Sequence, residues 1–277
     1  MNSLWKRRWI GLGLVLFVLF LAQDGSRAAE SGTVETSIPT PPVAETYCYD
    51  IAFLWFDRIA EAELSLQPAE ESNRWQATLE AHTRGVAAWL TSDRAQHYAS
   101  LMQLEDKGVF TSLHHDSNIF KTKDGQQRSR LKRYVFDHQQ QRLIQRVNRN
   151  GRQKKDVVLP MPSTTPNDIL TAFYNFRNGV FGPVVEGATC RIPTYSSKGP
   201  SEIVVEVLGS KQRPRKPKFP KQGLLLKVHI DKEIFDTENG IAYVWLDPQG
   251  RPAQVVVEDV IGLGNVRGTL QKKGPQL

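Results

Sequence analysis

Hydrophobic and polar residues alternate with a period of two along most of the chain from residue 46 onward. Because successive side chains of a β-strand point to opposite faces, this alternation predicts strands with one buried face. Turn sequences rich in Gly, Asn and Asp separate them at short intervals, without intervening helices. The pattern therefore predicts a mainly β fold, a curved antiparallel meander that is half-barrel or barrel-like, or a sandwich. We expect strands near residues 74–82, 95–104, 108–119, 128–137, 142–149, 203–207, 224–230, 241–246, 253–260 and 265–270.

The beginning of this pattern is apolar at every position. Residues Ile51–Phe56 read IAFLWF, so a strand here would be covered on both faces. Asp57 and Arg58 interrupt the apolar run, and regular alternation resumes over residues 60–66. We expect one long strand with a β-bulge at Asp57-Arg58.

One segment has the period of a helix. Thr165 can cap it, Pro166 suits the first helical position, and Asp168 in the first turn complements the helix dipole. Asn178-Gly179 supplies the stop. We expect a helix over residues 166–177 that packs on the curved sheet through an apolar stripe made of Ile169, Leu170, Phe173, Tyr174 and Phe176.

The N-terminus has the order of a secretory signal peptide. Three cations at residues 6–8 precede the 14 apolar residues Trp9–Ala22, and small residues follow at Ser26 and Ala28. A helix of this length rises about 21 Å, less than the roughly 30 Å of a bilayer core. We therefore expect residues 1–28 to be cleaved near Ala28 and the protein to be exported to the periplasm, with an N-terminal anchor in the inner membrane as the alternative.

The mature chain divides into three parts. Residues 29–45 are rich in Ser, Thr and Pro and predict a flexible leader, residues 46–272 a single β-rich domain, and residues 273–277 a short tail. Loss of the signal lowers the formal charge from +7 to +4. Nucleic acid is not an expected partner of an exported protein with so mild a charge, whereas anionic lipid headgroups or acidic glycans are.

Cys48 and Cys190 are the two cysteines of the chain. An oxidising compartment permits a disulfide between them, and in the chain-entropy model a loop of this length would contribute about 4–5 kcal/mol. Two unpaired thiols on separate strands would give the same sequence pattern. Both alternatives stay open at this stage.

Short segments occur along the chain in a fixed order: Tyr49-Asp50, Trp55, Ala60-Glu61-Ala62, Thr83-Arg84-Gly85, Asp93, Tyr98, Phe136-Asp137, Asp168–Tyr174 with Arg177, Trp245-Leu246, Pro252 and Gly264. This series resembles the bacterial exported family known as domain of unknown function 3108. The resemblance covers nearly all of residues 47–270, but Ala60 replaces a usual Gly and a basic loop follows Gly209. It implies a curved antiparallel sheet broadly similar to periplasmic lipid-carrier folds, and it brings no accepted catalytic residues.

Signatures of catalysis and metal binding are missing from the sequence. It contains no Gly-x-Ser-x-Gly, His-Glu-x-x-His or Cys-x-x-Cys motif. His114 and His115 are adjacent, so in a strand they point to opposite faces and do not share a metal. We expect no catalytic residues, no metal and no cofactor.

Two tracts are strongly basic. Residues Lys121–Asp156 contain twelve Lys or Arg, and residues Lys211–Lys221 contain six together with three prolines. Charged edge strands and loops that deter aggregation are one interpretation. Contact with anionic lipid or glycan is the other. The candidates for such contact in the second tract are Arg213, Arg215, Lys216, Lys218 and Phe219.

Several aromatic residues belong either to the core or to an apolar cleft between helix and sheet. Our leading interpretation is a non-enzymatic envelope protein that binds or shelters an apolar or lipid-like ligand. A scaffold protein with a filled core and a basic docking surface is the alternative, and a hydrolase with an unrecognised site is the third. The sequence names no protein partner. The cleft candidates are Phe53, Trp55, Phe56, Phe173, Tyr174 and Trp245.

Overall fold

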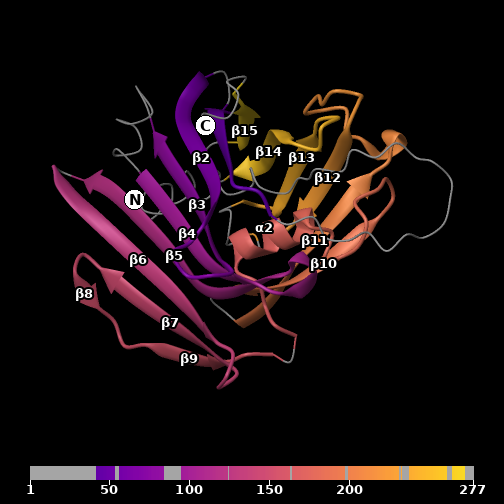
Figure 1. Ribbon diagram of the computed structural model, residues 1–277. Helices are drawn as coiled ribbons and strands as arrows, with labels where there is room; N and C mark the ends of the chain where they lie inside the picture. Colours follow the sequence, from indigo (N-terminus) through magenta and orange to yellow (C-terminus); the bar gives the residue numbers. More distant parts are fainter. Residues whose placement is uncertain are drawn as a thin grey trace.

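The computed structural model describes residues 42–53, 56–83, 95–123, 125–162, 164–196, 199–230, 232, 237–260 and 264–271. Within these ranges, fifteen antiparallel strands form one sheet that curls around the helix α2 (Ile169–Arg177) (Figure 1). The expected curved antiparallel, mainly β fold is confirmed. The expected signal peptide, most of the leader and the tail lie outside the described residues.

The elements follow one another mostly as hairpins. In chain order they are β1 (Glu45–Phe53), β2 (Phe56–Pro68), β3 (Arg74–Thr83), β4 (Ala95–Leu104), η4 (Asp106–Gly108), β5 (Phe110–Lys123), β6 (Gln126–Asp137), β7 (Arg142–Arg149), β8 (Arg152–Gln153), β9 (Val157–Pro160), α2 (Ile169–Arg177), β10 (Thr189–Ser196), β11 (Gly199–Leu208), η5 (Ser210–Gln212), β12 (Leu224–His229), β13 (Ile241–Leu246), β14 (Pro252–Val260) and β15 (Gly264–Leu270).

The first and last strands meet in the middle of the sheet. β1 pairs with β15 on one side and with β2 on the other, which joins two meanders, β10–β15 and β1–β8. The sheet path ends at β10 and at β8, while β9 pairs with β7. A side-chain contact joins β10 to the other meander, because the rings of Tyr134 in β6 and Tyr195 in β10 lie 5.3 Å apart.

The core lies between α2 and the concave face of the sheet. Inward-facing residues of both meanders form one buried cluster, in which alternate positions such as Leu64, Leu79 and Val244 are fully covered. Every residue of α2 from Leu170 to Arg177 is buried. The sheet therefore surrounds the helix instead of covering a single stripe of it, which confirms the expected packing of the helix on the curved sheet.

The helix begins later than the sequence suggests. It starts at Ile169, and its N-cap is Asp168, whose side chain accepts hydrogen bonds from the backbone N–H groups of Leu170 and Thr171. The expected cap at Thr165 and first helical position at Pro166 are wrong. A carboxylate within reach of two helix N–H groups is a stronger cap than an exposed threonine, and the chain before it follows β10.

The long strand expected from residue 51 onward is also wrong. The chain reverses between Phe53 and Phe56, which are paired across a hairpin. Phe53 ends β1 and Phe56 begins β2, so this part of the sequence does not form a single strand covered on both faces. The irregularity expected at Asp57-Arg58 does occur, since the register shifts between Ile51 and Phe53 and Arg58 has a φ of 52°.

Replacing Phe173 by Ala tests the filled core. The ring is 1% exposed and packs against Tyr174 with a centroid distance of 4.7 Å. A buried Phe→Ala change typically costs about 3–5 kcal/mol of unfolding free energy. We expect a loss of this size in urea denaturation, whereas the exposed Val158→Ala should change the free energy by less than about 0.5 kcal/mol. Equal, small losses in both variants would show that the helix is not part of the core.

Candidate functional site

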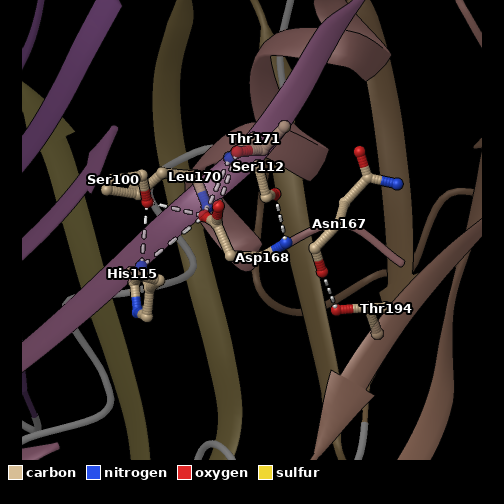
Figure 2. Close-up of polar contacts among 8 residues, drawn as sticks. All are labelled: Ser100, Ser112, His115, Asn167, Asp168, Leu170, Thr171 and Thr194. Carbon is tan, nitrogen blue, oxygen red and sulfur yellow. Dashed lines mark hydrogen bonds and ion pairs between the residues drawn. The ribbon is translucent and has the colours of Figure 1, made fainter. Parts of the chain in front are cut away.

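The N-terminal end of α2 is surrounded by buried polar groups (Figure 2). Asp168 Oδ1 accepts hydrogen bonds from the N–H groups of Leu170 at 3.0 Å and Thr171 at 3.1 Å, and Oδ2 accepts the Thr171 hydroxyl at 2.6 Å. The residue is only 6% exposed. Its charge is accommodated there by these donors and by the positive end of the helix dipole.

Strands β4 and β5 add three more polar side chains to this cluster. Ser100 donates to Asp168 Oδ1 at 2.6 Å, and Ser112 accepts the backbone N–H of Asp168 at 2.9 Å. His115 Nδ1 lies 2.8 Å from Ser100 Oγ and 3.5 Å from Asp168 Oδ1. Ser112 and His115 both face inward because the register between β4 and β5 shifts between them. Without this bulge, His114 would take the inward position.

Strand β10 holds the other side of the same segment. Thr194 donates its hydroxyl to the carbonyl of Asn167 at 2.9 Å, and Asn167 donates its backbone N–H and its side-chain amide to the carbonyl of Pro193 (Figure 2 shows the Thr194 bond). Asn175 further along α2 bonds both backbone groups of Phe110 in β5. The polar cluster therefore ties the helix to both meanders of the sheet.

Ser100, His115 and Asp168 are the residue types of a hydrolytic triad, but their order is different. In a nucleophilic triad the histidine stands between serine and carboxylate and takes the serine proton. Here Ser100 stands in the middle, with its proton directed to Asp168 and its oxygen accepting from His115 Nδ1. Burial lowers the pKa of His115, against the opposing effect of Asp168, so the ring is neutral at pH 7. Ser100 is 0% exposed. This arrangement holds a helix end and does not activate a nucleophile.

The C-terminal end of α2 is fixed by an ion pair. The guanidinium of Arg177 pairs with the carboxylate of Glu45 in β1, with Nη2 3.0 Å from Oε2. It also lies 5.4 Å from the ring centroid of Phe173 and 5.7 Å from that of Tyr47. A cation at this end complements the negative end of the helix dipole, so both ends of the buried helix have a charged partner.

The cleft candidates do not come together in one place. Phe173 and Tyr174 belong to the core around α2. Trp245 lies on the outer face of β13 in a separate cluster with Phe219, and its indole N–H donates to Gln222. Two more, Phe53 and Phe56, contact each other at the β1–β2 hairpin, with ring centroids 5.8 Å apart. Trp55 lies outside the described residues.

Both cysteines are free in the structure. Cys48 is in β1 and Cys190 is in β10, at the far end of the sheet path, so the disulfide considered from the sequence does not form. Burial, with the neighbouring carboxylate of Glu63, raises the pKa of the Cys48 thiol, and burial raises that of Cys190. Both thiols therefore stay protonated at neutral pH.

The second basic tract forms an ordered loop between β11 and β12. Arg213 donates to the carbonyls of Pro220, Lys221 and Gly223, and Phe219 packs on Tyr243 with ring centroids 5.9 Å apart. Both side chains are half-buried and hold the loop together. The remaining cations of the loop are exposed: Lys211, Arg215, Lys216, Lys218 and Lys221.

Gly223 closes this loop against the sheet. Its φ is +82°, and a Cβ atom added there would lie 2.0 Å from the carbonyl oxygen of Leu246. Only glycine fits this close approach. The loop thus has a fixed path although it contains only one short helical turn, η5.

The first basic tract forms a projecting part of the sheet that we call the wing, made of β6, β7 and β8 with residues 119–122 of β5. Figure 1 shows the wing extending away from the strands that enclose α2. On its outer side, cations have carboxylate partners, since Arg133 Nε lies 2.6 Å from Asp116 Oδ1 and Arg146 Nε lies 3.1 Å from Asp156 Oδ2. These pairs balance the charge of that side.

The inner side of the wing has a different charge pattern. Alternation along β6 places three cations on the side of Phe136, which is buried against Leu143 and Met161. The strand register adds Lys121 opposite Arg128, Arg149 opposite Arg130, and Arg152 opposite Arg149. No Asp or Glu occupies an inner position in the described parts of β4–β8. We call this set the inner cations: Lys121, Arg128, Arg130, Lys132, Arg149 and Arg152.

Among the described residues, no group of three or more His, Cys, Asp or Glu is arranged to hold a metal ion. In the same part of the chain, no helix has the length and apolar character needed to cross a membrane.

The family model of the proteins of unknown function DUF3108 matches residues 48–271. The chain belongs to this family. The DUF3108 chain is also similar to a crystal structure of a β-barrel-like protein of domain of unknown function DUF1849 from Brucella abortus. The two share 10% sequence identity with a TM-score of 0.46, over 85% of this chain and 99% of the other. No curated protein matches the chain.

Replacing Asp168 by Ala tests the structural role of the polar cluster in the DUF3108 chain. The change removes a helix cap, at about 1 kcal/mol, and leaves buried donors unpaired, at about 1–3 kcal/mol. We expect urea denaturation to show a loss of about 2–4 kcal/mol. The control is Thr165→Ala, which removes the exposed residue that the sequence suggested as a cap and should have little effect. A larger loss in the control than in Asp168→Ala would contradict the assignment.

Lys132 should give the wing a measurable pH dependence. Burial, followed by the charge of Arg130, lowers its pKa from 10.5 to about 8. Between these values the unfolded chain binds more protons than the folded one, so stability should rise with pH over that window. Lys132→Met should therefore have a higher Tm than the wild type at pH 7, with a difference that shrinks towards pH 10.5. Lys154→Met controls for loss of one charge, and an unchanged difference at both pH values would contradict this account.

Proposed function

We propose that this DUF3108 chain is an exported envelope protein that acts by binding, and that it docks on a surface of anionic lipid headgroups through the loop between β11 and β12. Export is supported by the cations at residues 6–8 and the apolar run Trp9–Ala22. A binding role is supported by the order of the Ser100–His115–Asp168 contacts, which does not suit nucleophilic catalysis.

The observation that carries this proposal is the construction of the loop. Arg213 and Phe219 use their side chains to fix the backbone, while five other cations point into solvent. No Asp or Glu occurs between Lys211 and Lys221, so these cations have no acid within the loop. A fixed loop loses little conformational entropy on binding, and each cation near an anionic membrane contributes about 1 kcal/mol.

The enclosed helix argues against the alternative function, in which the concave sheet shelters an apolar ligand. The residues that a concave sheet would offer to such a ligand contact α2 instead, and Phe173 and Tyr174 lie in that core. External surfaces are then the places where this fold meets a partner. A lipid that co-purifies with the folded protein in a one-to-one ratio, found by mass spectrometry, would favour the sheltering function over docking.

The docking proposal is tested with the triple variant Arg215→Gln, Lys216→Gln, Lys218→Gln, which leaves Arg213 in place. Three lost contacts should weaken binding to phosphatidylglycerol vesicles more than about tenfold at low salt. Because salt shortens the Debye length from about 10 Å at 0.1 M to about 3 Å at 1 M, wild-type binding should fall steeply with salt.

A second triple variant controls for net charge. Lys107→Gln, Lys155→Gln, Arg267→Gln removes three exposed cations elsewhere on the molecule. We expect it to bind vesicles within about threefold of the wild type, and both triple variants to keep the wild-type Tm within a few degrees. Equal binding by the wild type and the loop variant would refute docking through this loop.

A further inference from the structure

The inner cations of the wing are arranged in rows. Arg130, Arg149 and Arg152 stand directly opposite one another on three neighbouring strands, and Lys121 stands opposite Arg128. Neighbouring strands lie about 4.8 Å apart, so the arginine row spans about 10 Å. Along β6, Arg128 and Lys132 are four residues and about 13 Å apart. With Lys121 on β5 the set covers four strands, or about 14 Å, so the six cations share an area of roughly 14 by 13 Å.

Such an arrangement is unfavourable in the free protein. Like charges directly opposite each other on paired strands destabilise a sheet. Among the described residues, Arg128, Arg130, Arg149 and Arg152 form no ion pair, whereas Arg133 on the outer side of the same strands does. The lowered pKa of Lys132 beside Arg130 has the same origin in part. An anion on the inner side would remove this repulsion.

We propose that the inner side of the wing binds a compact group carrying two or more phosphates. Four of the six cations are arginines, whose planar guanidinium forks donate paired hydrogen bonds to phosphate oxygens. The small area requires a ligand with several charges close together, which phosphates supply more densely than single carboxylates. This inference goes beyond docking through the β11–β12 loop and does not depend on it.

The position of the wing limits what can reach these cations. Phe136 and Tyr134 follow Lys132 on the same side of β6, and Tyr134 contacts Tyr195 of β10. The inner side is therefore the side of the sheet that faces β10. A single lipid headgroup or a soluble phosphorylated compound suits this side better than the flat surface of a bilayer.

Inorganic tripolyphosphate is the probe, with binding to the full mature chain measured by calorimetry. The test variant is the double Arg130→Gln, Arg149→Gln, an opposed pair on the inner side. The matched control is the double Arg133→Gln, Arg146→Gln, an opposed pair on the outer side of the same two strands. We expect the inner double to lose more than tenfold in affinity and the outer double less than threefold.

The outcomes separate the alternatives. Equal losses in the two doubles, or no tripolyphosphate binding by the wild type, would overturn the proposal. Equally tight binding of polygalacturonate, which carries only carboxylates, would overturn the assignment to phosphate. If the inner double does not fold by circular dichroism, the single variant Arg152→Gln at the exposed end of the row replaces it, with an expected loss of at least threefold.

Vesicles distinguish the two sources of phosphate. Vesicles with cardiolipin, which carries two phosphates, are compared with phosphatidylglycerol vesicles of equal total charge. A preference for cardiolipin that the inner double loses identifies a lipid headgroup, and tripolyphosphate binding without this preference identifies a soluble compound. The loop variant Arg215→Gln, Lys216→Gln, Lys218→Gln should bind tripolyphosphate normally, so failure of docking through the loop is visible separately from failure at the wing.

Discussion

A helix enclosed on every side must have its free N–H groups paired, and the structure of this protein depends on how that requirement is met. The first turn of a helix has no intrahelical partners for these donors, and water does not reach them here. Asp168 pairs two of them, but a buried carboxylate itself needs donors, which Ser100 and Thr171 provide. Burial keeps His115 neutral, so it completes the set without adding a charge. A constellation that resembles catalytic chemistry by residue type thus follows from the demands of one helix end.

The same helix determines the shape of the sheet. Because α2 occupies the centre and is tied to β5 through Asn175 and to β10 through Asn167, the strands curl around it and the two sheet edges remain apart. Strands β6–β8 continue past the region that the helix covers. They have only the small cluster of Phe136, Leu143 and Met161 as a buried core. The wing is therefore free to carry charged residues on both sides, which a strand packed on α2 is not.

Much of the fold can be predicted from the alternation of hydrophobic and polar residues alone. This pattern is a local property of each strand and does not depend on which strands pair. Strands β4, β7 and β13 have the bounds that the pattern predicts, and the apolar stripe of the helix was visible. The sequence does not predict strand β10, because Pro193 and the mixed polarity of TCRIPTYS interrupt the alternation. It does not predict the β1–β2 hairpin either, because the residues there are apolar on both faces. The Asp168 cluster joins residues 68 positions apart, which no local pattern reports. Its one signal in β4 is a pair of polar residues, Gln96 and Ser100, at positions that should face the core.

The two sides of the wing differ in charge, and the net charge of the segment does not reveal this difference. Counted along the chain, Lys121–Asp156 is a basic tract with a few acids, which is compatible with a solvated edge. Sorted by strand parity, the described acids lie with the outer cations, and the inner side has none. Solubility alone would be served by cations distributed over both sides with their acids, so it does not account for the segregation. A side that accumulates opposed arginines at a cost to its own stability is explained more simply by an anion that completes it.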